Sequence, residues 1–190
     1  MWLIVMKGFA GSGKSTLARA LSRELGWPLI DKDDIKDLLD GSVQAAGPLA
    51  YAIMFNIARR QLLQGLNVIC DSPLTGTITY ERAQFAAKEA SASLAIVECL
   101  CSDASLWQQR INDRKALQLP AHHQTDWEAY QLLLRQSQLQ EHQYPTTHPH
   151  VVIDTAQPLH HCLTSLLARL DHLKQPSSKE AKRDREPGGM

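Results

Sequence analysis

Short apolar runs alternate with amphipathic segments along most of the 190-residue chain. An apolar run of this length between turn signals is typical of a buried strand. Such runs occupy residues 2–6, 27–30, 66–70, 94–101 and 150–153. Because helical sequence separates these five strands, the pattern predicts an α/β fold, with a five-stranded parallel sheet and helices on both faces.

Between the runs, apolar residues recur three or four positions apart, which indicates amphipathic helices. The expected helices cover residues 17–25, 35–39, 49–64, 79–90, 104–114, 128–142 and 159–173. Gly26 is placed to end the first helix, and Pro28 blocks its continuation. Asp33 or Asp34 is placed to cap the second helix, and Asp103 to cap the fifth.

The composition is that of one globular domain, with 44% hydrophobic and 21% charged residues. Residues 174–190 consist mainly of Lys, Glu, Arg, Pro, Ser and Gly, a mixture that cannot bury a core. We therefore expect a folded domain over residues 1–173 and a disordered tail at 174–190. The formal net charge is zero, so no overall field would attract nucleic acid or a membrane.

Targeting signals are not expected. The first strand begins within two residues of the first Met, which leaves no room for a signal peptide, and no apolar run is long enough to span a membrane. The cysteines are not paired as C-x-x-C, so we expect reduced thiols and a cytoplasmic protein. These cysteines are Cys70, Cys99, Cys101 and Cys162. The histidines are not spaced as a metal-ligand set, and we expect them on the surface.

The strongest chemical signal is the pattern G-x-x-x-x-G-K-[ST], which begins where the first predicted strand ends. Its residues, with one more that follows, are Gly8, Phe9, Ala10, Gly11, Ser12, Gly13, Lys14, Ser15 and Thr16. In this pattern backbone N–H groups converge on phosphate oxygens, the lysine reaches the β- and γ-phosphates, and the Ser15 hydroxyl binds Mg²⁺. The strand before it and the helix after it complete the required context, so it predicts a site for ATP and Mg²⁺.

Acidic residues follow the second and third predicted strands, at the sheet edge where ligands bind in such folds. Phosphoryl transfer to a hydroxyl group needs a carboxylate near the attacking oxygen, and Asp33 is our first choice for this base. Asp31 and Asp34 are the alternatives. Asp71 is expected to hold Mg²⁺ or its waters, to contact the acceptor, or only to begin a turn before Pro73.

Arg110 and Arg114 are four residues apart and therefore share one face of a predicted helix. Two guanidinium groups beside a triphosphate can neutralise the charge that develops on the transferred group. The alternative is a solvated face with Asp113 as partner. Because the helix leads into a polar segment at residues 116–126, as a closing lid would, we predict a phosphate role for at least one arginine.

Together these motifs resemble the small P-loop kinases of the AAA-33 type, which are related to polynucleotide kinase, zeta toxin and chloramphenicol phosphotransferase. The resemblance covers residues 1 to about 170. It rests on residues 8–16, 29–36, 68–73, 107–114 and 152–155. It implies a P-loop NTPase fold similar to nucleoside-monophosphate kinases, with a helical lid that carries the two arginines.

The resemblance also implies roles for single residues. The first Asp of the family's D-D-x-R stretch is the general base, which corresponds to Asp33. The basic residue three positions further on helps to hold substrate, and it is Lys36 here, where most relatives have arginine. The loop after the last strand often touches adenine, which implies a nucleotide contact for Thr155 and Gln157.

The main hypothesis is an ATP-dependent kinase for a hydroxyl group of a small molecule, held between residues 38–55 and the lid. A polynucleotide 5′-hydroxyl is the alternative acceptor, disfavoured because no basic stretch is interleaved with aromatic residues. A second hypothesis is a nucleotide-switch NTPase whose only acceptor is water. A catalytically inactive homologue is disfavoured because the motif lysine, its serine and the two strand-end aspartates are all present.

Overall fold

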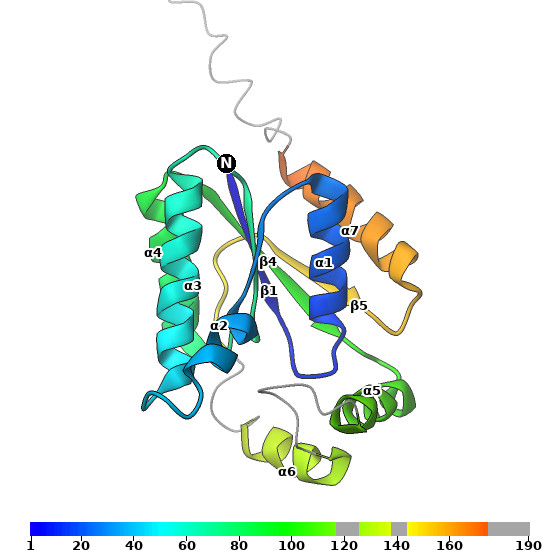
Figure 1. Cartoon of the computed structure of the whole chain (residues 1–190). Coiled ribbons are helices and arrows are strands. Elements are labelled where there is room, and N and C mark those ends of the chain that lie inside the picture. Colours follow the sequence, from blue (N-terminus) through cyan, green and yellow to red (C-terminus); the bar gives the residue numbers. More distant parts are fainter. Residues whose placement is uncertain (117–125, 138–143, 175–190) are drawn as a thin grey trace, which may run out of the picture.

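The computed structural model describes residues 1–116, 126–137 and 144–174 and has an α/β fold (Figure 1). Its five strands are β1 (Trp2–Lys7), β2 (Leu29–Asp31), β3 (Val68–Asp71), β4 (Ser93–Leu100) and β5 (His150–Asp154). They form one sheet in the order β2-β3-β1-β4-β5, and every neighbouring pair is parallel. The predicted five-stranded parallel sheet is confirmed.

Helices cover both faces of this sheet, as predicted (Figure 1). They are α1 (Lys14–Leu25), α2 (Lys32–Leu39), α3 (Ala46–Leu62), α4 (Gly76–Glu89), α5 (Ala104–Ala116), α6 (Trp127–Ser137) and α7 (Leu159–Lys174). Helices α1 and α7 lie on one face, and α3 and α4 on the other. Helices α5 and α6 lie beyond the carboxyl ends of the strands, and we call this pair the lid.

The central strand β1 supplies both halves of the core, because its successive side chains point to opposite faces. Leu3 and Val5 pack with α3 and α4, whereas Ile4 and Met6 pack with α1 and α7. All four side chains are at most 1% exposed. A strand buried on both faces has no polar alternation, which is why residues 2–6 form one continuous apolar run.

Several expected boundaries shift in the structure. Strand β2 is Leu29–Asp31 rather than residues 27–30, and α4 begins at Gly76 rather than at Thr79. The cap of α2 was wrongly assigned: the Asp31 side chain, not Asp33 or Asp34, accepts the hydrogen bond, from the backbone N–H of Asp33 at 2.9 Å. The cap of α5 is as expected, because the Asp103 carboxylate accepts from Leu106 N–H at 3.0 Å.

Some predicted segments lie outside the described residues. These are most of the polar lid segment with its two histidines, the end of the helix expected at 128–142, and the tail after Lys174, which is the last residue of α7. All four cysteines are buried and free, as expected. Among the described residues, no helix is both long and apolar enough to cross a membrane.

The core under α1 gives a first prediction. Leu21 is completely buried between α1 and the sheet, so replacing it with alanine removes apolar contacts and leaves a cavity. We expect Leu21→Ala to lower the free energy of unfolding by about 2–5 kcal/mol in urea denaturation. The control Leu63→Ala removes the same atoms from a side chain that is 56% exposed, and should change stability by less than about 0.5 kcal/mol. Equal losses in the two variants would contradict this packing.

Candidate active site

Residues 8–16, called the phosphate loop here, follow β1 and include the first three residues of α1, at the carboxyl edge of the sheet. Its glycines are required by close contacts. A Cβ atom on Gly8 would lie 2.4 Å from the carbonyl oxygen of Cys99, and one on Gly13 would lie 2.8 Å from Thr155 Oγ1. Gly11 and Gly13 also have φ values of 74° and 79°, in the left-handed region that favours glycine. The shape of the loop is therefore constrained by β4 and by the residue that follows β5.

Two polar groups of the phosphate loop are buried. Lys14 is the first residue of α1, and it is only 5% exposed. Burial lowers the pKa of Lys14, while the nearby carboxylates of Asp71 and Asp33 raise it and Arg114 lowers it further. The Ser12 hydroxyl is buried without a hydrogen-bond partner among the described residues. An anionic group at this place would meet a positive charge and an unused hydroxyl.

Asp71 ends β3 and faces Lys14. It is 1% exposed, and neither carboxylate oxygen has a hydrogen-bond partner among the described residues. Burial raises the pKa of Asp71, against the lowering effects of the Lys14 ammonium and the Ser15 hydroxyl. Two buried carboxylate oxygens beside a serine hydroxyl form a set of oxygen ligands of the kind that a hard cation prefers.

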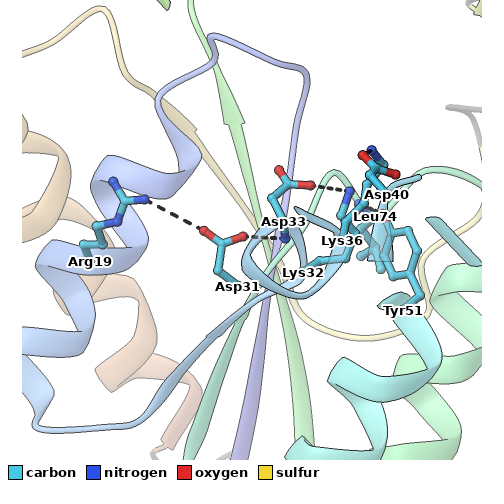
Figure 2. A network of polar contacts seen from close by, with 8 residues as sticks. All are labelled: Arg19, Asp31, Lys32, Asp33, Lys36, Asp40, Tyr51 and Leu74. Atoms are coloured by element: carbon cyan, nitrogen blue, oxygen red, sulfur yellow. Dashed lines mark hydrogen bonds and ion pairs between the residues drawn. The ribbon is translucent and has the colours of Figure 1, made fainter. Parts of the chain in front are cut away.

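Asp31 lies beside Asp71, because the two are register partners at the ends of β2 and β3. Figure 2 shows Asp31 between the Arg19 guanidinium, 3.9 Å away, and the backbone N–H of Asp33. Burial, followed by the repulsion from Asp71, raises the pKa of Asp31 to about 6. One of its oxygens is used to cap α2, so the structure gives Asp31 a capping role.

Asp33 and Asp34 differ in their surroundings although they are neighbours in the chain. Asp34 is exposed, whereas Asp33 is only partly so and forms an ion pair with Lys32. Asp33 is also close enough to Lys14, Asp71 and Arg114 to influence the pKa of each. Of the two, Asp33 is therefore the carboxylate that lies with the phosphate-loop lysine.

The two lid arginines of α5 take different positions. Burial lowers the pKa of Arg114, while Asp33 and Asp71 raise it, which places this guanidinium beside the carboxylates. Arg110 instead donates two hydrogen bonds to Thr155, to Oγ1 at 2.9 Å and to the carbonyl oxygen at 2.8 Å. Thr155 Oγ1 in turn donates to the Ser12 carbonyl oxygen at 2.7 Å. The loop after β5 is thereby fastened to both the lid and the phosphate loop.

A cavity of about 340 Å³ opens next to this contact. Its lining includes Gly13 and Thr16 of the phosphate loop, both lid arginines, Thr155 and Gln157. Of the residues expected at the nucleotide, the cavity is therefore lined by Gly11, Gly13, Thr16, Arg110, Thr155 and Gln157. Lys36, which was expected to hold substrate, does not line this cavity. Its ammonium is paired with Asp40, one helical turn further along the chain.

Aromatic residues of the lid contact the phosphate loop, and the sequence analysis missed this role. Trp107 Nε1 donates to the Ala10 carbonyl oxygen at 2.8 Å, and its ring lies 6.2 Å from that of Phe9. Trp127 and Tyr130 of α6 pack edge-on against Trp107, at 5.5 and 6.1 Å between ring centroids. The sequence did contain a signal for this contact. Trp127 and Tyr130 are three residues apart, which places both rings on the same face of a helix.

Lys32 was also missed. It is a buried lysine, 8% exposed, at the first position of α2 and directly before Asp33. Its ammonium pairs with Asp33 and lies 5.6 Å from the centre of the Tyr51 ring (Figure 2). From the sequence alone, Lys32 is only a residue that follows a short strand. Nothing in the local pattern indicates that its side chain is buried.

Fold and site together define a nucleotide-binding P-loop protein. The chain belongs to the AAA domain family of the AAA-33 type, whose family model matches residues 3–141. No curated protein matches the sequence.

Solved structures support the same fold. A protein of Chloroflexus aurantiacus assigned as a kinase is 22% identical, with a TM-score of 0.69 over 90% of this chain and 96% of its own. A gluconokinase of Sinorhizobium meliloti is 20% identical, with a TM-score of 0.60 over 96% and 97%. The APS kinase CysC of Mycobacterium tuberculosis, in complex with AMPPNP and APS, is 15% identical, with a TM-score of 0.61 over 89% and 96%. At these identities the likeness establishes the fold, that of small P-loop kinases.

The raised pKa of Asp31 gives a prediction about stability. The carboxyl group has an ordinary pKa of 3.8 and a pKa of about 6 when folded, so the folded state binds the proton more tightly. The contribution of Asp31 to stability is therefore greatest below about pH 4 and is lost as the pH rises through about 6. Asn caps helices as well as Asp does, so Asp31→Asn should keep the cap but remove this loss. The stability of the variant relative to wild type should rise between pH 4 and pH 7 in urea denaturation.

Asp34→Asn is the matched control, because Asp34 is exposed and lies three residues after Asp31, in the first turn of α2. Its stability difference from wild type should vary much less over the same pH range. Parallel pH curves for wild type and Asp31→Asn would contradict the burial of the Asp31 carboxylate.

Proposed function

We propose that this protein is an ATP-dependent kinase that transfers the γ-phosphoryl group of Mg-ATP to a hydroxyl group of a small molecule. The observation that carries the proposal is the gathering of Asp33, Asp71 and Arg114 around the buried Lys14 ammonium. Phosphoryl transfer needs positive charge at the moving group and a carboxylate at the attacking oxygen. This group of side chains supplies both at the end of the phosphate loop.

The residues fit the nucleotide and its metal ion. We assign the cavity beside Arg110, Thr155 and Gln157 to the adenosine part of ATP, and the backbone of the phosphate loop to its phosphates. Ser15 and Asp71 would hold Mg²⁺, directly or through water, since the Asp71 carboxylate is buried beside the Ser15 hydroxyl. Bound there, Mg²⁺ would neutralise charge on the β- and γ-phosphates.

In the proposed reaction, Asp33 accepts the proton of the acceptor hydroxyl as its oxygen attacks the γ-phosphorus. The new O–P bond forms while the bond from the γ-phosphorus to the oxygen that bridges to the β-phosphorus breaks, and ADP leaves with that oxygen. Lys14 and Arg114 stabilise the negative charge on the moving phosphoryl group. The lid over the phosphate loop would exclude water, so that the phosphoryl group reaches the acceptor instead.

We assign the acceptor to a cavity that is connected to the proposed base through Tyr51 and Lys32. This cavity of about 520 Å³ lies between the first turns of α3 and α4, and Pro48, Tyr51, Thr75, Arg82 and Tyr144 line part of it. Its Tyr51 ring faces the Lys32 ammonium, which pairs with Asp33. This position agrees with the expected acceptor region at residues 38–55. A small-molecule acceptor also agrees with the fold neighbours, of which one is a gluconokinase and another an APS kinase.

The direct test uses γ-labelled ATP, Mg²⁺ and a metabolite extract, with a 5′-hydroxyl oligonucleotide in a parallel reaction. Label in a new small compound supports the proposal and yields the acceptor for identification. Label on the oligonucleotide would replace the small-molecule acceptor with a polynucleotide. Release of label only as free phosphate would favour a nucleotide switch.

The base assignment predicts a sharp difference between two neighbouring carboxylates. Asp33→Asn keeps the shape of the side chain but cannot accept the proton, so transfer of label should fall by about 10²–10⁴-fold. ATP binding, measured with a fluorescent analogue, should persist because Asp33 is not assigned to the nucleotide. Asp34→Asn should transfer label nearly as well as wild type, because Asp34 is exposed. Full activity of Asp33→Asn would show that another group is the base.

The lysine of the phosphate loop gives the complementary prediction. Lys14→Ala removes the buried ammonium that faces the phosphates and should lower both ATP affinity and transfer, the latter by about 10²-fold or more. A thermal unfolding curve with a single transition would show that the variant is folded. If Lys14→Ala bound and used ATP normally, the phosphate loop would not be the nucleotide site.

A further inference from the structure

The position of Lys32 is unfavourable for a lysine in two respects. It occupies the first position of α2, where the positive end of the helix dipole disfavours a cation, and it is 8% exposed, although burial of an ammonium group is costly. Residues that break local rules inside an otherwise consistent fold concentrate at functional sites. A stabilising partner or a function must account for the position of this lysine.

The partners of Lys32 are the Asp33 carboxylate and the face of the Tyr51 ring. The ammonium forms an ion pair with Asp33, and it lies 5.6 Å from the centre of the ring, within the range of a cation–π contact (Figure 2). The ring cannot easily move. Tyr51 is 8% exposed, stacks on Phe55 and accepts a hydrogen bond from Leu74 N–H at 3.1 Å. Through the ring, Lys32 is fixed to α3 and to the segment after β3.

The second lysine of α2 does not share this position. Lys36 pairs with Asp40, an exposed residue one turn along the helix. The side chain of Lys32 is 10% exposed, whereas that of Lys36 is 26% exposed. Of the two, Lys32 is therefore the lysine that contacts the carboxylate beside Lys14 and Arg114.

We infer that Lys32 is a positioning residue, which holds the Asp33 carboxylate toward the acceptor hydroxyl and is itself held by the Tyr51 ring. The inference rests on the proposed kinase function and adds a residue to it. A base must lie within hydrogen-bond reach of the proton that it removes, so a fixed side-chain direction affects the rate of the chemical step. Lys32 acts through Asp33, and its effect should vanish when Asp33 can no longer accept a proton.

The test compares Lys32→Met, Lys32→Arg and the control Lys88→Met, all as full-length protein. Lys88 is an exposed lysine in the last turn of α4. The assay measures incorporation of label from γ-labelled ATP into the products of a metabolite extract, at several ATP concentrations. We expect Lys32→Met to lower the rate at saturating ATP by about 10- to 100-fold, with little change in KM for ATP. Lys32→Arg, which keeps the charge, should recover part of the rate, and Lys88→Met should match wild type.

A double-mutant cycle separates positioning from a purely structural role. If Lys32 acts through Asp33, then Lys32→Met should cause no further loss in an Asp33→Asn background. Losses that multiply, or a Lys32→Met variant as active as wild type, would overturn the inference while leaving the kinase intact. Absence of labelled product with wild type would instead overturn the proposed function and this inference together. If Lys32→Met does not fold, Lys32→Gln, which keeps polarity without charge, takes its place in the same comparison.

Discussion

The structure depends on a balance of buried charge at the carboxyl edge of the sheet. Lys14 and Asp71 are both almost completely buried, and each favours the charged form of the other against the effect of burial. Neither could remain ionised alone, because an isolated buried charge loses several kcal/mol of hydration. The parallel sheet makes the balance possible, since adjacent strands deliver their last residues to the same edge, with Asp31 beside Asp71.

The same edge explains why the phosphate loop needs support from distant parts of the chain. Its glycines are in contact with β4, with the loop after β5 and with Trp107 of the lid. The hydrogen bond from Trp107 to Ala10 joins residues 97 positions apart. The loop is thus a short sequence motif, but its shape is fixed by tertiary contacts, which include those with Trp107 of the lid.

The fold and the phosphate loop could be predicted because their signals are local. Strand and helix periodicity extend over many residues, and the loop motif fits only a strand–loop–helix context. The start of α2 could not be fixed in this way. Three aspartates in four residues can all cap a helix, and the choice depends on which carboxylate reaches a backbone N–H. Contacts such as Lys32 with Tyr51 require a third element and leave no mark in the local pattern.

The residue that caps α2 determines which aspartate can be proposed as the base. If Asp33 capped α2, one of its oxygens would be bound to the backbone and its direction set by the helix. Because Asp31 performs this task, Asp33 projects from the first turn of the helix, where Lys32 contacts it and where Lys14 and Arg114 lie within electrostatic reach. Asp31 and Asp33 are two residues apart and chemically identical, yet Asp31 caps the helix and Asp33 pairs with Lys32 near the Lys14 ammonium. This division follows from the boundary between β2 and α2, because Asp31 is both the last residue of the strand and the N-cap of the helix.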